Sequence, residues 1–246
     1  MAAFLGVAIW ESVQPLRTLS APTGTRWRDH AGLYAVSTVL QTIAIRLFPT
    51  GVAALALSSP LGVLNNAAIP FGLRCVATVL ILDLLQYGAH RTYHGRHLWR
   101  VHEVHHSDVD FDVSLGVRFH PLEILPVQLV HAAAALLLAP PPIAVLGSQL
   151  LGVTLDFLTH ANARFPWRFE RLLRTVFITP DLHRIHHSAD QAGHSRNFGQ
   201  ILSVWDRLFG TFAGSQAAGE VRTGVDGVDG GSDIQRLLVR PFRTGK

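Results

Sequence analysis

Histidine is concentrated in three short patterns whose spacing is suited to metal binding. The first is His90-Arg-Thr-Tyr-His94, and the other two share the arrangement His-x-x-His-His, at residues 102–106 and 183–187. Residues three and four apart share one face of a helix, so each pattern should direct two or three imidazoles the same way. Together they offer enough nitrogen ligands for two metal ions: His90, His94, His102, His105, His106, His183, His186 and His187.

The remaining composition restricts this chemistry to imidazole. Cys75 is the one cysteine in the sequence, so neither an intrachain disulfide nor a thiolate cluster can form. A zinc hydrolase would need a catalytic glutamate in the arrangement His-Glu-x-x-His. Because His105 follows His102-Glu103 at a different spacing, we set that class aside. For any single histidine, simple solvation or a bond to a loop carbonyl remains an alternative.

The overall composition indicates a membrane protein. Of 246 residues, 48% are hydrophobic and 15% charged, whereas soluble domains are about 25% charged. Lys246 is the only lysine and the net charge is +4, which gives no dense basic face for nucleic acid. Arginines instead cluster between apolar stretches, as in cytoplasmic loops of membrane proteins.

We therefore expect an all-α integral membrane bundle of about four spanning helices, with a His-rich helical layer on the cytoplasmic side. The first ten residues are apolar but too short to span, and fit the end of a short or truncated first helix. Residues 31–48 should span, with Arg46 reaching the interface. Residues 49–70, interrupted by prolines, should form an interfacial loop or half-helix, and residues 71–89 should cross back.

Residues 122–138 and 143–159 should form a helical hairpin, because the three prolines at 140–142 force a tight reversal between two apolar runs. Such a hairpin places the histidines before it and after it on the same side of the membrane. The arginine-rich loops make that side the cytoplasm. The glycine-rich segment after residue 213 should be partly ordered and chemically silent.

The three histidine patterns, together with the residues around them from about 72 to 213, resemble the fatty acid hydroxylase or sterol desaturase superfamily. Trp10, Glu11, Pro15 and Arg17 also resemble the entry segment of its bacterial members. The residues that carry the main resemblance are Asp83, Tyr87, His90, Arg91, His94, Leu98, Trp99, Arg100, His102, His105, His106, Ser107, Arg118, His120, Pro121, Leu122, Glu123, His160, Asn162, Thr179, Pro180, His183, His186, His187, Ser188, Asn197, Phe198, Gly199, Trp205, Asp206, Phe209, Gly210 and Thr211.

The resemblance implies a membrane-embedded non-haem oxygenase with two iron ions and O2 as co-substrate, although zinc could replace iron in isolated protein. The eight histidines would be ligands, with His160 as a ninth. His120 would either bind metal or cap the entry to the hairpin. The chain would divide into N-terminal membrane segments at 1–71, a catalytic domain at 72–213 and a tail at 214–246.

Two acids within apolar helices, and one asparagine, complete the predicted site. Asp83 lies seven residues before His90 and Asp156 four before His160, so each carboxylate should accept a hydrogen bond from a ligand imidazole. A helix–helix hydrogen bond without a metal role is the alternative. Asn162, in the same motif as His160, is grouped with them.

The implied reaction is hydroxylation or desaturation of a lipid C–H bond, in a sterol-like, carotenoid, acyl or ether lipid. The sequence shows no flavin or nicotinamide motif, so an external reductase or electron-transfer protein must supply electrons. The three residues between His90 and His94, and Arg164 in place of a further histidine, favour the sterol desaturase-like branch over ceramide hydroxylases. The alternative is a non-catalytic membrane protein that retains a structural metal site.

Overall fold

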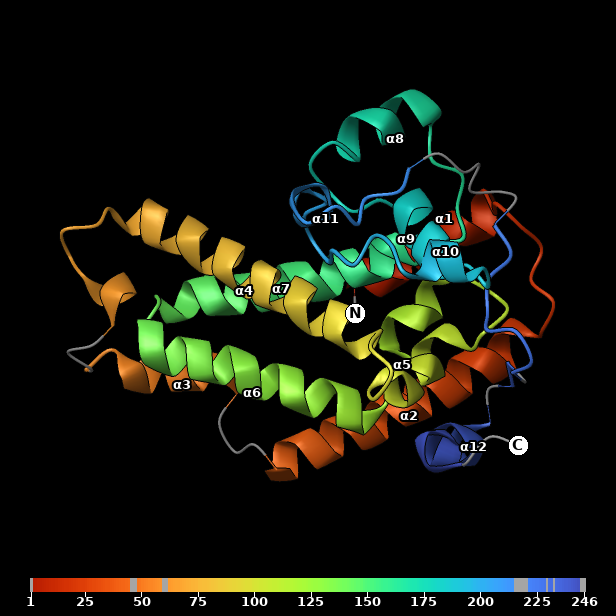
Figure 1. Ribbon diagram of the computed structural model, residues 1–246, viewed down its shortest axis with the longest axis horizontal. Coiled ribbons are helices and arrows are strands. Elements are labelled where there is room, and N and C mark those ends of the chain that lie inside the picture. Colours follow the sequence, from red (N-terminus) through yellow and green to blue (C-terminus); the bar gives the residue numbers. More distant parts are fainter. Residues whose placement is uncertain are drawn as a thin grey trace.

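The computed structural model describes residues 2–44, 48–58, 62–214, 221–228, 230, 231 and 233–243. Within these ranges the regular structure is helical, with three isolated β-bridges (Figure 1). This confirms the all-α prediction. The helices are α1 (Ala2–Val13), α2 (Thr23–Ala44), α3 (Pro49–Ala56), η1 (Val63–Asn65), α4 (Phe71–Tyr93), α5 (Trp99–His106), η2 (Val113–Val117), α6 (Pro121–Leu138), α7 (Pro142–Thr159), α8 (Trp167–Leu173), α9 (Pro180–His186), α10 (Gln191–His194), α11 (Val204–Leu208), α12 (Ile234–Val239) and η4 (Arg240–Phe242).

Helices α4, α6 and α7 form an apolar bundle that extends from one end of the molecule (Figure 1). Among the described residues, these three helices are long and apolar enough to cross a membrane. At about 1.5 Å per residue, α6 and α7 each extend roughly 27 Å. Leu82, Ala135 and Val145, one from each helix, meet Ala53 of α3 in a buried cluster. The predicted crossings at 71–89, 122–138 and 143–159 are thus confirmed as helices of spanning length.

The chain reverses between α6 and α7 at the end of the bundle remote from α5 and α9 (Figure 1). Ala139 ends α6 in the left-handed region, with φ of 45°, and proline in the first turn of α7 suits a helix start. Gly62 packs on this turn: a Cβ added there would lie 2.1 Å from the Ala139 Cβ, so a side chain does not fit. The predicted hairpin is confirmed, and it returns the chain to the end from which it started.

Helix α2 departs from the predicted span at residues 31–48. It begins earlier, at Thr23, and its first turn carries Arg26, which is buried and paired with Asp108 at 3.0 Å. Because this first turn lies among buried charged side chains, a membrane crossing by α2 cannot begin at Thr23. Within the described residues α2 is not among the three candidate spans, and residues 45–47 of the predicted span lie outside the described residues. Arg46 lies outside the described residues.

The segment predicted as an interfacial loop or half-helix contains the half-length helix α3 and the short turn η1. Helix α3 starts at a proline and packs against α6 and α7, near their connecting turn (Figure 1). Pro60 falls outside the described residues. This segment closes the bundle at the end away from the histidines.

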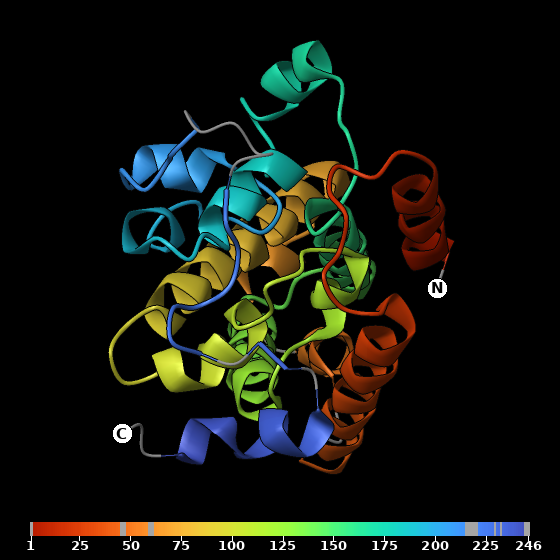
Figure 2. The ribbon, with the colours of Figure 1, turned by 90° about the vertical axis from the view of Figure 1, so that its right-hand side faces the viewer.

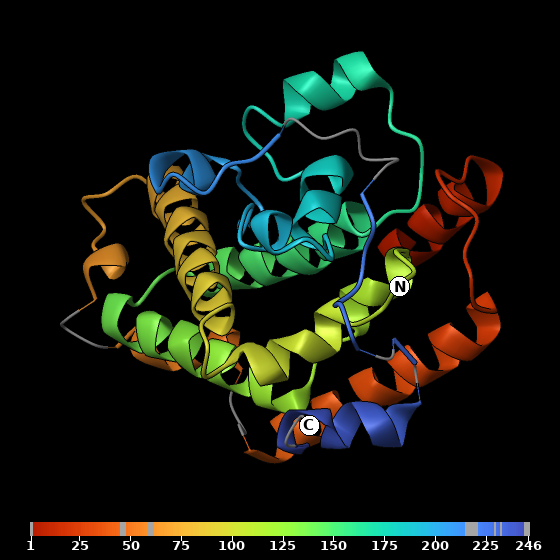
Figure 3. The same cartoon turned by 45° about the vertical axis from the view of Figure 1, so that its right-hand side comes forward.

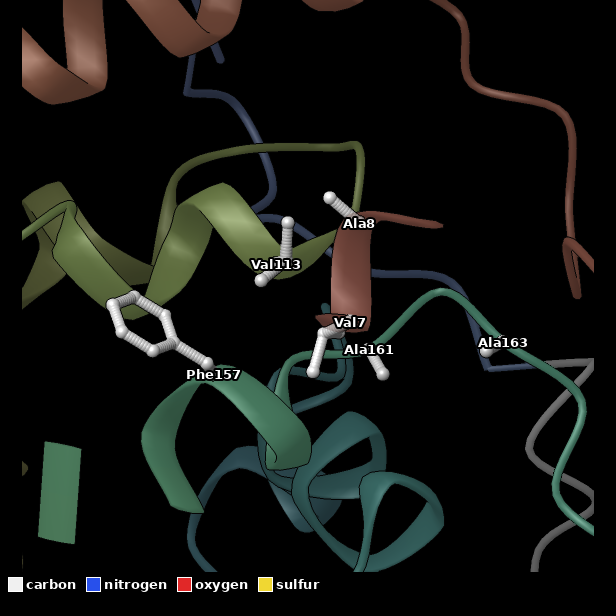
Figure 4. Packing of buried hydrophobic residues seen from close by; sticks show 6 residues of the cluster. All are labelled: Val7, Ala8, Val113, Phe157, Ala161 and Ala163. Carbon is white, nitrogen blue, oxygen red and sulfur yellow. The ribbon is translucent and has the colours of Figure 1, made fainter. Parts of the chain in front are cut away.

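The N-terminal helix α1 is short, as predicted, and docks at the other end of α7. Figure 4 shows Val7 and Ala8 of α1 in one buried cluster with Val113, Phe157 and Ala161. The Glu11 carboxylate accepts hydrogen bonds from the backbone N–H groups of Val113 (2.8 Å) and Asn162 (2.7 Å). Helix α1 therefore fixes the segment that follows the predicted ligand His160.

The C-terminal segment crosses the polar layer, as the blue ribbon in Figures 2 and 3 shows. The Thr223 hydroxyl donates to the backbone carbonyl of Val109 at 2.7 Å. Arg240 pairs with Glu103 of α5 at 2.9 Å, and Leu237 of α12 is fully buried. The described parts of the tail are ordered and pack over the helices that carry the histidines, and the prediction that the tail is chemically silent stays a prediction.

Candidate metal centre

Nine histidines converge in two groups at the inner end of the helical bundle. Within each group, one nitrogen from every histidine lies within 4.8 Å of all the others. The members come from α4, α5, α7 and α9 or the residues that cap them. The first group is His90, His94, His102, His106 and His186; the second is His105, His160, His183 and His187.

The geometry of the helix explains how each His-x-x-His-His pattern serves both groups. Adjacent residues on a helix point about 100° apart, whereas residues four apart point nearly the same way. Accordingly, His102 and His106 of α5 face the first group, and the intervening His105 faces the second. In α9 the arrangement is reversed, with only His186 facing the first group. The expectation that each pattern points one way is corrected: the doublets divide between the groups.

Helix ends place three of these residues. His94 caps the C-terminus of α4, His160 that of α7 and His187 that of α9. Helix α9 begins as predicted, with Pro180 in its first turn and the Thr179 hydroxyl accepting from the N–H of Leu182 at 3.4 Å. Stable ends therefore hold the ligands at fixed positions.

The Nε2 atoms within each group approach one another closely. In the first group His102 Nε2 lies 3.1 Å from that of His90 and 3.0 Å from that of His106. In the second, His160 Nε2 lies 2.9 Å from that of His183 and 3.3 Å from that of His105. A neutral imidazole carries a single N–H, so such a set of converging nitrogens cannot all be satisfied by each other.

The opposite nitrogen of several rings is held by acceptors. Nδ1 donates to the backbone carbonyl of Phe198 from His90 (2.8 Å) and to that of Arg196 from His186 (2.7 Å). His160 Nδ1 donates to the Asp156 carbonyl at 2.6 Å. Carbonyls only accept, so these bonds place the proton on Nδ1 and leave the Nε2 lone pair directed into the group.

Several other ring nitrogens are buried without a hydrogen-bond partner among the described residues, including both nitrogens of His94 and of His187, and Nε2 of His186. Each such atom costs about 1–3 kcal/mol if it stays unpaired. A cation among the converging lone pairs would satisfy nitrogens in both groups. The donor sets, nine imidazoles without a thiolate, suit a divalent transition metal such as iron, zinc or copper.

Burial also keeps these histidines in the form that binds metal. Burial is the main cause, and neighbouring imidazoles a smaller one, that holds the pKa well below its ordinary value in His105, His106, His183 and His187. Burial lowers the pKa of His102 to about 3 and that of His160 to about 4. The rings are therefore neutral near pH 7, as metal coordination requires.

The predicted hydrogen bonds from two aspartates to the ligands are not formed. The Asp156 carboxylate accepts from Gln200 Nε2 at 2.9 Å. The backbone carbonyl of Asp156, which also accepts from the backbone N–H of His160, holds the His160 ring instead. The Asp83 carboxylate accepts from the backbone N–H of Ile201 (3.0 Å) and from Trp205 Nε1 (2.8 Å). Asp83 thus fixes the loop whose Phe198 carbonyl orients His90, without touching the ring.

The carboxylate that does bond to a ligand ring is Glu123, which sequence reasoning assigned no role. Glu123 Oε1 lies 2.7 Å from His102 Nδ1. The available signal was its place near the start of an apolar helix, where a buried acid is costly without a function.

The hydrolase pattern also needs correction. With His106, residues 102–106 do satisfy the spacing His-Glu-x-x-His, so spacing alone does not exclude that class. The position of Glu103 argues against a hydrolase, because Glu103 points away from the metal group and pairs with Arg240 at 2.9 Å. It cannot act as the base of a metal-bound water there.

His120 and Asn162 lie outside both histidine groups. His120 caps α6, its Nδ1 accepting from the N–H of Leu122 at 3.2 Å, and its Nε2 lies 3.1 Å from the Leu238 carbonyl. Of the two alternatives for His120, capping is the one observed. The Asn162 side chain bonds to the backbone of Arg17, through Nδ2 to the carbonyl (2.9 Å) and through Oδ1 to the N–H (3.1 Å).

A cavity of about 480 Å³ lies between α2, α4, α6 and α7 and reaches both histidine groups. Its inner end is lined by His90 and His102 of the first group and by His105, His160 and His183 of the second. Its volume falls in the range of about 300–1,000 Å³ found for small-molecule sites. Its walls run along the candidate spans, which is where a lipid chain would enter.

Comparison with known proteins gives a consistent picture. A family model for fatty acid hydroxylases matches residues 75–211, more than half of the chain. The ornithine lipid hydroxylase OlsE of Rhizobium tropici is 33% identical over 160 residues, which are 64% of this chain and 47% of that protein. Alkylglycerol monooxygenase of Homo sapiens is 31% identical over 135 residues, 53% of this chain and 28% of that protein.

A sterol-modifying relative matches as well. Methylsterol monooxygenase 1 of Danio rerio is 29% identical over 156 residues, 56% of this chain and 46% of that protein. No solved structure gives a significant match. The chain spans about half or less of the length of these curated relatives. The matched region contains all nine converging histidines, and the chain belongs to the fatty acid hydroxylase family.

Proposed function

We propose that this chain is a membrane di-iron oxygenase that hydroxylates or desaturates a C–H bond of a lipid. The observation that carries this proposal is the pair of imidazole groups at the inner end of a cavity between candidate membrane spans. Two iron ions held there would supply the reduction of O2 and the removal of hydrogen from an unactivated C–H bond. The nine histidines of the two groups would be the ligands.

The residues around the groups would orient the ligands and the substrate. The carbonyls of Phe198, Arg196 and Asp156 fix three rings, and the Glu123 carboxylate fixes a fourth. The cavity holds the lipid against both groups and keeps bulk water out, which favours attack on the bound chain over side reactions.

The substrate class follows from the membrane location and the family. The printed names of the relatives refer to an ornithine lipid, an alkylglycerol and a methylsterol. These lipids share little beyond an apolar portion, so they support a lipid substrate without selecting among sterol-like, carotenoid, acyl and ether lipids. Electrons would come from an external reductase or electron-transfer protein.

We further propose that the histidine groups face the cytoplasm, because arginine-rich segments flank them. Reporter fusions after Phe111 and after Asp190 should then both report cytoplasm, and a fusion within 140–142 should not. Opposite sides for the first two positions would refute this orientation. We also propose that the chain divides into N-terminal membrane segments at 1–71, a catalytic domain at 72–213 and a tail at 214–246.

Labelling with oxygen-18 gas tests the activity even while the substrate is unidentified. Membrane lipids of a host that expresses the protein are compared by mass spectrometry with those of a host that expresses His105→Ala. We expect a lipid that gains one labelled oxygen, or loses two hydrogens, only with the unchanged protein. Identical lipid profiles, with the protein inserted and carrying iron, would favour a structural metal site instead.

A further inference from the structure

The cavity ends in a polar floor inside the apolar bundle. Its lining includes Gln128 and His131 of α6 together with Ser148 and Gln149 of α7. Polar side chains at this depth are costly and mark functional sites by default. These residues lie on the far side of the cavity from the histidine groups, and nothing in the proposed reaction accounts for them.

Helical spacing gives the distance between this floor and the metal centre. On α6, His131 lies eight residues beyond Glu123, which bonds to the ligand His102. At about 1.5 Å per residue, Gln128 lies roughly 8 Å and His131 roughly 12 Å from Glu123 along the axis of α6. Between the two ends the same wall of α6 is apolar, with Ile124 and Val127 facing the cavity.

The hydrogen bonds at the floor leave one donor and one acceptor free. The Thr50 hydroxyl donates to Gln149 Oε1 at 2.8 Å, and Gln149 Nε2 donates to Gln128 Oε1 at 3.5 Å. The Oε1 atom of Gln128 is thus engaged by Gln149, whereas the amide N–H groups of Gln128 form no hydrogen bond with another described residue.

His131 supplies a second polar atom. Its Nε2 is buried without a hydrogen-bond partner among the described residues. A neutral imidazole can accept a hydrogen bond at this nitrogen. Gln128 and His131 are three residues apart and so share one face of α6.

We propose that this floor binds a hydroxyl group of the lipid substrate. A hydroxyl both accepts and donates, so it can accept from Gln128 Nε2 and donate to His131 Nε2 at once. The inference rests on the proposed function and narrows its substrate class. The substrate is a lipid with a hydroxyl roughly 8–12 Å from the carbon to be oxidised, not a plain hydrocarbon chain.

Binding of two probes that differ by one hydroxyl tests this proposal. The affinities of dodecane and of dodecan-1-ol are measured on the iron-loaded protein in nanodiscs under argon, so that no turnover occurs. The alcohol should bind roughly 3- to 10-fold more tightly, the usual value of one hydrogen bond. Gln128→Leu and His131→Leu should each abolish this preference, by replacing the polar group with an apolar one of similar size.

Leu129→Ala is the matched control, since Leu129 lies between the two residues in sequence but is 53% exposed on the outer face of α6. The control should keep the preference for the alcohol. Equal affinities for both probes in the unchanged protein would overturn the proposal and indicate a floor that binds water only. A preference that survives in both leucine variants, or is lost in the control, would overturn it as well.

The proposed function fails separately from this inference. An unchanged protein that binds iron but neither adds labelled oxygen to a lipid nor removes two hydrogens from one defeats the proposed function, whatever the probe affinities. An unchanged protein that oxidises a lipid but shows no preference for the alcohol defeats only the hydroxyl site.

Discussion

The carboxylate of Glu123 lies 2.7 Å from Nδ1 of His102, joining the start of α6 to a histidine of α5. This bond fixes the ring so that its Nε2 faces His90 and His106. A carboxylate behind a ligand imidazole orients it and raises its basicity.

Glu123→Gln should therefore weaken metal binding or turnover by roughly 10- to 100-fold while the protein still inserts. Competition with a chelator measures the affinity. Glu103→Gln is the control, because Glu103 is adjacent to His102 but pairs with Arg240 near the surface. Equal effects of the two variants would contradict the role given to Glu123.

Asp156→Asn should leave metal affinity close to the unchanged value. The group that holds His160 is the Asp156 backbone carbonyl, which the substitution preserves, and the asparagine oxygen can still accept from Gln200. The same chelator competition applies. A loss of tenfold or more would show that the carboxylate acts on the ligand after all.

The metal-free protein should lose stability as the pH falls. Histidines whose pKa is lowered in the folded state, such as His102 at about 3 and His160 at about 4, stay neutral there but take up protons on unfolding. These residues do not reduce the free energy of unfolding above about pH 6.5. As the pH falls from there toward the pKa values of the folded state, each residue lowers the free energy of unfolding by about 1.4 kcal/mol per pH unit.

Thermal unfolding in detergent between about pH 8 and pH 5 measures this slope. Replacing His102 with Gln should make the slope shallower, because one such group is removed. An unfolding midpoint that does not change with pH would contradict the burial of the histidine layer.

Asp108→Asn should strongly destabilise the layer beneath the histidines. Asp108 pairs with Arg26 at 3.0 Å and with Arg118 at 2.9 Å, and all three are buried. Burial alone would raise the pKa of Asp108, yet the His30 hydrogen bond and the two arginines hold it below its ordinary value. Removing one partner of a buried ion pair costs about 3–5 kcal/mol.

Chemical unfolding followed by tryptophan fluorescence reports that loss. Asp226→Asn is the comparison, since it breaks an ion pair that is largely exposed, and it should change nothing measurable. Two variants of equal stability would show that the buried network contributes no more than a surface pair.

The spans and the ligand histidines could be predicted because they depend on side chains. Three apolar runs and the prolines at 140–142 specify the helices, and two His-x-x-His-His patterns specify the ligands. The start of α2 was missed because Arg26 reads as a loop residue until Asp108 is seen beside it.

The groups behind the ligands were harder to foresee for a different reason. His90, His186 and His160 bond to backbone carbonyls, which every residue carries and no sequence pattern marks. A carboxylate at helical spacing, such as Asp156, looked the better acceptor because only side chains are visible in a sequence. The Asp156 carboxylate instead accepts a hydrogen bond from Gln200, which lies in a loop distant in sequence.

Iron content per chain tests the central claim most directly. His105 belongs to the second histidine group and His186 to the first, so each alanine substitution should disable one metal position. Elemental analysis of protein purified without oxygen should give two iron ions per unchanged chain. It should give about one in His105→Ala and in His186→Ala, with membrane insertion intact. Full iron content in either variant, or none in the unchanged protein after reconstitution, would contradict a two-metal centre built from these histidines.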